Sequence, residues 1–112
     1  MLNSVGNFLI DPRGDIYNCL GGVGEKVFML GNINDDFNTL FLKLSKFIEM
    51  DKCAGNEECT SCKYLPMCAG GCSFESYVNF GSINKIVCVK DQLEIEIPNV
   101  LKLLYIDKKY DE

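Results

Sequence analysis

The chain has 112 residues, of which 47% are hydrophobic by a broad count, and its formal net charge is −5. This length corresponds to one small domain with a modest core. The acidic balance excludes a nucleic-acid-binding protein and a basic membrane-binding face, and no apolar run approaches the length of a membrane span.

The start of the chain carries no targeting pattern. Residues 1–6 lack a basic start, a long apolar stretch and a small-residue cleavage site, so they do not predict a secretory signal. We therefore expect a cytoplasmic protein. Thiols stay reduced in that compartment, and seven cysteines cannot all pair with one another, so we do not expect a disulfide scaffold.

The segment 7–19 predicts a β-hairpin that ends in a thiol, Cys19. Its turn, residues 11–14, has Asp first, Pro second and Gly fourth, the side chains that a type I turn favours. Beyond a glycine-rich loop, residues 26–30 predict a third extended segment, which Gly31 and Asn32 close.

An amphipathic helix is predicted within residues 34–51. Asn34 or Asp35 can cap its first turn, and apolar residues follow at steps of three and four. Such a stripe indicates a helix that faces the core and carries no chemistry of its own. The stripe consists of Phe37, Leu40, Phe41, Leu44, Phe47 and Ile48.

The rest of the chain is dominated by cysteines and then by a second helical pattern. No periodicity is visible in residues 53–72, as expected where metal bonds set the path of the backbone. Residues 72–80 predict a short helix with Phe74, Tyr77 and Val78 on its packing side. Residues 90–107 are helical in pattern, with Pro98 expected to kink or restart the helix, and a charged tail follows.

These elements predict a small α+β domain stapled by metal. Its expected parts are a hairpin and third strand in 1–33, a helix in 34–51, cysteine-rich loops in 53–88, and a C-terminal helix and tail in 89–112. A small domain with a thin core gains most of its stability from such inorganic staples.

Five of the seven cysteines follow the spacing C-x2-C-x5-C-x3-C-x15-C. A C-x2-C pair brings two sulfurs together across a tight turn in both zinc and iron–sulfur sites. The chain has no histidine, and seven thiols do not divide into tetrahedral sets of four, which favours iron–sulfur chemistry. Spacing alone leaves zinc open as the alternative. The five are Cys59, Cys62, Cys68, Cys72 and Cys88.

The ordered motifs resemble the SPASM domain, the C-terminal auxiliary-cluster module of radical S-adenosylmethionine enzymes that mature peptides and proteins, such as anaerobic sulfatase-maturing enzymes. The resemblance rests on G-x4-C from Gly14 to Cys19, on the segment 30–33 before the helix, and on C-x2-C-x5-C-x3-C followed by a later cysteine. It covers nearly the whole chain.

The resemblance implies two [4Fe–4S] clusters. One would be held by four cysteines that are all present, and the other would take Cys19 and Cys72. The family has a further cysteine before Gly14, which this chain lacks, so the second of these sites is short of ligands. Cys53 either supplies a ligand or is an unligated thiol beside the site. The complete set is Cys59, Cys62, Cys68 and Cys88.

The resemblance also implies a function in which this chain is only one part. The catalytic C-x3-C-x2-C motif of radical S-adenosylmethionine enzymes is absent, so the chain is not expected to be an enzyme alone. The expected partners are the barrel domain that binds S-adenosylmethionine and a peptide or protein substrate, and the expected roles are electron transfer and substrate positioning. The alternatives are a zinc-stabilised interaction module without a redox role and a fragment with no independent function.

Three other patterns are weaker candidates. The acidic pairs Asp35-Asp36 and Glu57-Glu58 indicate a helix start and a solvated loop rather than acid–base catalysis. The glycines in 21–24 lack the order of a phosphate-binding loop. Residues 64–67 could shield a cluster from water or could be ordinary packing.

Overall fold

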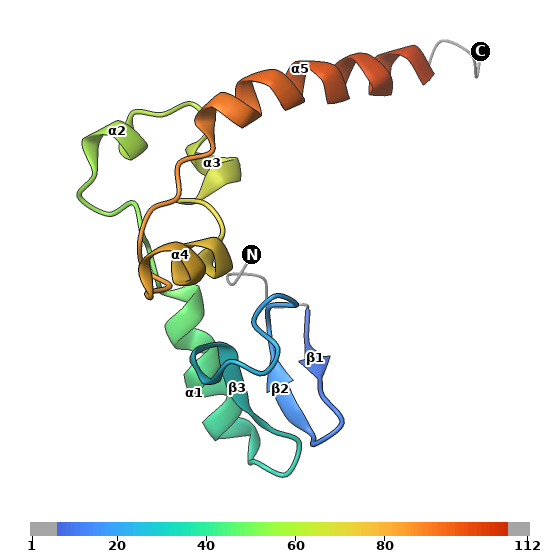
Figure 1. The fold of residues 1–112 in the computed structure, drawn as a ribbon, viewed down its shortest axis with the longest axis vertical. Coiled ribbons are helices and arrows are strands. Elements are labelled where there is room, and N and C mark those ends of the chain that lie inside the picture. Colours follow the sequence, from blue (N-terminus) through green and yellow to red (C-terminus); the bar gives the residue numbers. More distant parts are fainter. Residues whose placement is uncertain (1–6, 108–112) are drawn as a thin grey trace.

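The computed structural model describes residues 7–107. The segment considered above for a targeting signal and the tail beyond Asp107 lie outside these residues. A three-stranded antiparallel sheet and five α-helices form an elongated molecule with extents of 50 × 40 × 23 Å (Figure 1). This mixed architecture confirms the predicted α+β class. The sheet and the first helix lie at one end, and the cysteine-rich loops lie at the other.

The predicted hairpin is present. Strands β1 (Leu9–Ile10) and β2 (Asp15–Tyr17) pair in antiparallel orientation, with Leu9 opposite Tyr17. The turn closes as expected, since Gly14 N donates to Asp11 O at 2.9 Å. The Asp11 carboxylate also accepts from the backbone amide of Asp15 at 3.0 Å, so this side chain fixes both ends of the turn.

The third strand begins later than the sequence predicts. Residues Lys26–Phe28 form a 3-10 turn, η1, and strand β3 covers Met29–Asn32 beside β2. The difference arises from Phe28, which is fully buried. A Cβ on Gly22 would lie 2.3 Å from the Phe28 ring, so the glycine loop closes directly over this side chain. The segment Lys26–Phe28 therefore forms a turn that buries Phe28 and does not extend the strand.

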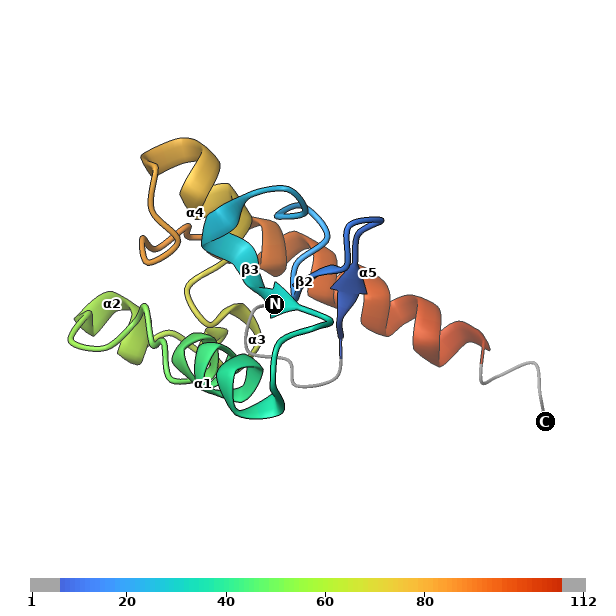
Figure 2. The same cartoon turned by 90° about the horizontal axis from the view of Figure 1, so that it is seen from below.

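Helix α4 (Ser73–Phe80) packs two of its aromatic side chains on Phe28. The ring centroids of Phe28 and Phe74 are 6.0 Å apart, and Tyr77 meets Phe28 edge to face at 5.6 Å. The predicted packing side is therefore confirmed for Phe74 and Tyr77. It is wrong for Val78, which is 64% exposed. In Figure 2 the β3 segment lies between α4 and the first helix, α1.

Helix α1 (Phe37–Ile48) is capped by Asp36, whose carboxylate accepts from Thr39 N at 2.9 Å. The predicted apolar stripe is only partly covered. Leu44 is buried, whereas Phe37 is 76% exposed and stacks on Phe41 on the outside of the helix. The small sheet is narrower than the stripe, so it covers the side of α1 that carries Leu44 and leaves the two phenylalanines exposed.

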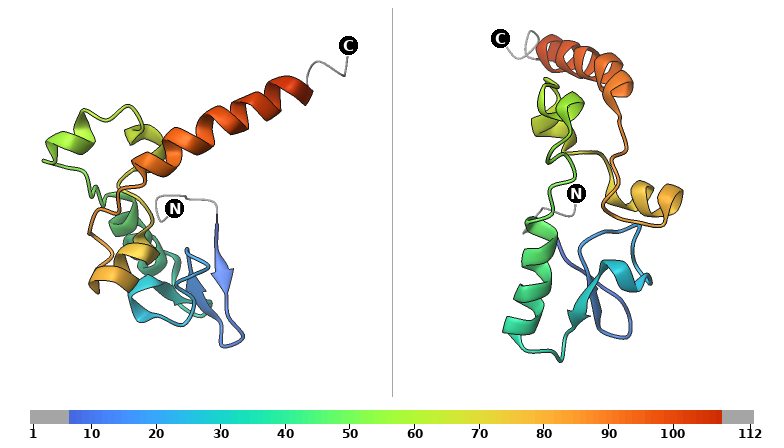
Figure 3. Two further views of the ribbon diagram at one scale, coloured as in Figure 1. Left: turned by 45° about the horizontal axis from the view of Figure 1, so that its top comes forward. Right: turned by 90° about the vertical axis from the view of Figure 1, so that its left-hand side faces the viewer.

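The C-terminal helix α5 (Lys90–Asp107) projects away from the body as an arm (Figures 1 and 3). It runs through Pro98 as one continuous element, so the restart expected there does not occur. Within residues 7–107, no helix combines the length and apolar character needed to cross a membrane.

A buried serine holds the loop between α4 and α5. Ser76 is fully buried; its Oγ donates to Ser82 O at 2.5 Å and accepts from Lys85 N at 3.0 Å. This loop continues to Cys88. The hydroxyl therefore fixes the path by which the last cysteine returns to the other four.

We predict that Ser76→Ala lowers the free energy of unfolding by about 1–3 kcal/mol, because it removes two part-buried hydrogen bonds, to the Ser82 carbonyl and from the Lys85 amide. Urea unfolding of the two proteins measures the difference. The matched control is Ser45→Ala, whose hydroxyl bonds an exposed carbonyl within its own helix. Equal effects of the two substitutions would contradict a structural role for the Ser76 hydroxyl.

Candidate metal centre

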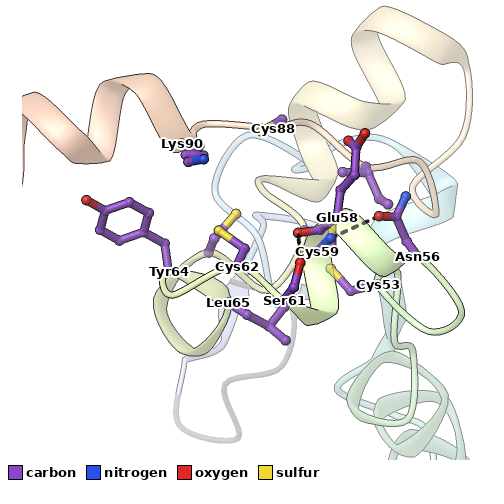
Figure 4. Close-up of a pocket in the computed structure, with 13 residues that line it drawn as sticks. Cys53, Asn56, Glu58, Cys59, Ser61, Cys62, Tyr64, Leu65, Cys88 and Lys90 are labelled. Carbon is purple, nitrogen blue, oxygen red and sulfur yellow. Dashed lines mark hydrogen bonds between the residues drawn. The ribbon is translucent and has the colours of Figure 1, made fainter.

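Five thiols line one cavity of about 420 Å³ in the cysteine-rich end of the molecule. They come from the loop before α2, from the α2–α3 segment and from the loop that enters α5, and Figure 4 labels four of them. All seven cysteines of the chain are free rather than paired. The five on the cavity wall are Cys53, Cys59, Cys62, Cys68 and Cys88.

Two single-turn helices set the positions of three of these thiols. Helix α2 (Glu57–Thr60) carries Cys59, whose amide donates to the capping side chain of Asn56 at 3.0 Å. Helix α3 (Leu65–Cys68) ends at Cys68, and Cys62 lies between the two helices. Cys62 N donates to Cys59 O at 3.1 Å. Both amides of the C-x2-C pair thus have partners: the Cys62 amide bonds a backbone carbonyl, and the Cys59 amide bonds the side chain that caps α2.

A left-handed turn separates Cys68 from Cys72. Ala69, Gly70 and Gly71 have φ values of 46°, 84° and 82°. Cys68 lines the first cavity and also a second one of about 730 Å³, whereas Cys72 lines the second only. Of these two thiols, only Cys68 therefore reaches the wall of the first cavity. A regular helix would instead have put them on one face.

The segment before Cys88 packs directly on this turn. Val87 N donates to Gly70 O at 2.9 Å. A Cβ on Gly71 would lie 2.1 Å from Val87 O, so only glycine fits there. These contacts explain how Cys88, although sixteen positions after Cys72, comes back to the wall of the first cavity.

Cys53 is the most buried of the five thiols, at 3% exposure. Burial, and then a hydrogen bond with the Cys59 thiol, raise the pKa of Cys53 to about 11. The sequence leaves two interpretations of Cys53, a ligand or an unligated thiol beside the site. Both agree with its position on the cavity wall next to Cys59.

Cys19 and Cys72 lie apart from this set. Cys19 packs against the aromatic core around Phe28, and it lines neither of the two cavities described above. Cys72 is exposed at the start of α4. Across residues 7–107, no three or more Cys, Asp or Glu side chains form a group that could hold a metal ion.

Sequence reasoning missed Lys52. Its Nζ donates to Gly71 O at 2.7 Å, and burial is the main cause that lowers the pKa of this lysine. A single lysine in a loop gives no signal in the sequence, because its partner lies nineteen residues away.

Residues 64–67, the candidates for shielding a cluster from water, are divided between the two cavities. Tyr64 and Leu65 line the first cavity, and Pro66 and Met67 line the second. The glycine loop has a packing role, since a Cβ on Gly21 would lie 2.8 Å from the Phe74 ring.

Part of the chain is similar to curated maturases. The mycofactocin maturase MftC of Mycolicibacterium smegmatis is 36% identical over 66 residues, which are 57% of this chain and 17% of that protein. The MftC of Mycobacterium tuberculosis strain H37Rv is 35% identical with the same coverage. The chain thus matches less than a fifth of the length of these relatives. No protein-family model and no solved structure matches it significantly.

Proposed function

We propose that this chain binds one [4Fe–4S] cluster and serves as the auxiliary-cluster module of a radical S-adenosylmethionine maturase. Four cysteines would hold the cluster. The observation that carries the proposal is that these four thiols, from separate segments of the chain, line a single cavity. The ligands are Cys59, Cys62, Cys68 and Cys88.

The residues of the cavity fit such a group. Iron–sulfur cubes are bound by four cysteine thiolates, and the wall offers these four and Cys53 as a fifth. A cluster has a volume of its own, so its ligand sulfurs surround a space instead of converging on one point. The short helices α2 and α3 hold the thiols without a large core, as expected of a domain stabilised by its inorganic group.

The cluster would supply one-electron redox chemistry. Four protein thiolates leave no iron open to a substrate, so electron transfer is favoured over direct ligation of a peptide. The chain's own residues would bind the cluster and limit its contact with water. Tyr64 and Leu65 on the cavity wall are suited to this shielding, which tunes the potential.

The wider role extends to partners outside this chain. The SPASM-like motifs and the partial similarity to mycofactocin maturases support a barrel domain that binds S-adenosylmethionine, and a peptide or protein as substrate. The second cluster site is incomplete in this proposal, because the cysteine that the family has before Gly14 is missing; of its two remaining candidates, Cys19 packs at the aromatic core and Cys72 lines the second cavity.

Anaerobic reconstitution with iron and sulfide tests the proposal. We expect a brown protein with about four iron and about four sulfide per chain; about eight of each would indicate two filled sites. Zinc without acid-labile sulfide, in protein prepared without oxygen, would contradict the proposal and support the zinc module. The anaerobic preparation matters because zinc can occupy thiol sites that are meant for iron and sulfur.

A further inference from the structure

We infer that Lys52 is a positioning residue for the thiol cavity: it holds the left-handed turn between Cys68 and Cys72 from the side of the second cavity and places a positive charge near the proposed ligand Cys68. This inference rests on the proposed function and extends it. It assigns a role to a residue outside the cysteine motif, argued from the contacts of the Lys52 side chain.

The aliphatic part and the ammonium group of the Lys52 side chain both contact the turn. The ammonium group donates to Gly71 O at 2.7 Å. A Cβ on Gly70 would lie 3.0 Å from Lys52 Cβ and 3.3 Å from its Cε, so the aliphatic stem lies along the backbone of the turn. The remaining side of the turn is held by Val87, whose amide donates to Gly70 O.

This arrangement joins the three segments that carry the cavity thiols. Lys52 precedes Cys53, the turn follows Cys68, and Val87 precedes Cys88. Gly70 and Gly71 adopt positive φ at little steric cost, but the left-handed conformation of Ala69 is costly and persists only where the surrounding contacts hold it. The lysine therefore stabilises the turn after which Cys72 lines only the second cavity, whereas Cys68 also reaches the first.

The charge of Lys52 also acts on the thiols. It interacts electrostatically with Cys72, Cys53 and Cys68, and its side chain lines the second cavity. Lys90, on the wall of the first cavity, is exposed, so solvent and salt screen it more strongly than the partly buried Lys52. A cation beside a cluster favours the more negative, reduced state and so raises its potential.

Three variants of the reconstituted chain test the inference. Lys52→Met removes the charge and the donor, Lys52→Arg keeps both, and Lys43→Met removes the charge of an exposed lysine on α1. We expect Lys52→Met to change the ratio of reduced to oxidised cluster about tenfold, a negative shift of about 59 mV for a one-electron couple. The other two variants should keep the wild-type midpoint potential. Loss of iron in Lys52→Met that Lys52→Arg restores would also support the role.

Two results would overturn the inference. One is a Lys52→Met protein with the iron content and potential of Lys43→Met, and the other is loss of iron in both Lys52 variants. Hydrogen exchange at the Val87 amide reports the turn with or without a cluster, and it should be several-fold faster in Lys52→Met. Equal exchange rates in the wild type and in Lys52→Met would overturn the turn-holding role, whether or not a cluster is bound. Failure of the wild type to bind a cluster is a separate outcome, which would contradict the proposed function.

Discussion

Cys68→Ala is expected to abolish the cluster. Cys68 ends helix α3 and lines the first cavity with the three other proposed ligands. Removing its thiolate leaves one iron without a protein ligand and opens the cube to solvent. After anaerobic reconstitution, the iron content should fall from about four per chain to background, and the brown visible absorption should disappear.

Cys72→Ala is the matched control, because it removes a thiol four positions away that faces only the second cavity. This variant should retain the iron, the sulfide and the absorption of the wild type. If both variants lost the cluster, the assignment of Cys68 but not Cys72 to the first cavity would be wrong. Intact absorption in Cys68→Ala would show that Cys68 is not a ligand.

The elements that sequence predicts well are those with local causes. The turn of the hairpin follows from Asp11 and Gly14, whose mutual hydrogen bond lies within four residues. Helix α4 is also where the sequence predicts it, with Cys72 as its cap residue and Gly81 in a left-handed conformation at its end. In both cases side chains and backbone groups adjacent in sequence determine the conformation.

The errors concern burial, which depends on distant partners. Lys26–Phe28 has the composition of a strand but forms a 3-10 turn, since Phe28 is held between Gly22 and the aromatics of α4. The periodicity of α1 predicts a buried stripe, but it does not reveal how wide a sheet will cover it. Phe37 therefore remains exposed despite fitting the pattern.

For the site, the spacing identifies candidate ligands but not how they are brought together. The pattern does not reveal that only Cys68 of the pair Cys68 and Cys72 reaches the first cavity, because the left-handed turn between them depends on Lys52 and on the segment before Cys88. The contact from Lys52 to Gly71 joins residues nineteen positions apart, so the spacing of neighbouring cysteines does not predict it. The close approach of Gly71 to the backbone of Val87 is likewise visible only in the structure.

Gly71→Ala is expected to destabilise the domain strongly. Its φ of +82° costs a non-glycine residue about 1–2 kcal/mol. In addition, the new Cβ would lie 2.1 Å from the backbone oxygen of Val87, which cannot move aside without displacing Cys88. Overpacking of this kind adds about 1–3 kcal/mol. The expected loss of unfolding free energy is therefore about 2–5 kcal/mol, together with poorer cluster retention.

Gly55→Ala separates the two causes, because Gly55 has a similar φ of +75° but nothing within 4 Å of its missing Cβ. This control should lose only the backbone term, about 1–2 kcal/mol, and should keep its iron. Urea unfolding and iron content of both variants, prepared anaerobically, give the comparison. Equal destabilisation would mean that the turn can yield at Val87, and the close approach would then not be what directs Cys88 to the cavity. A larger loss at Gly71 would show that the contact between the turn and Val87 governs the position of the last ligand.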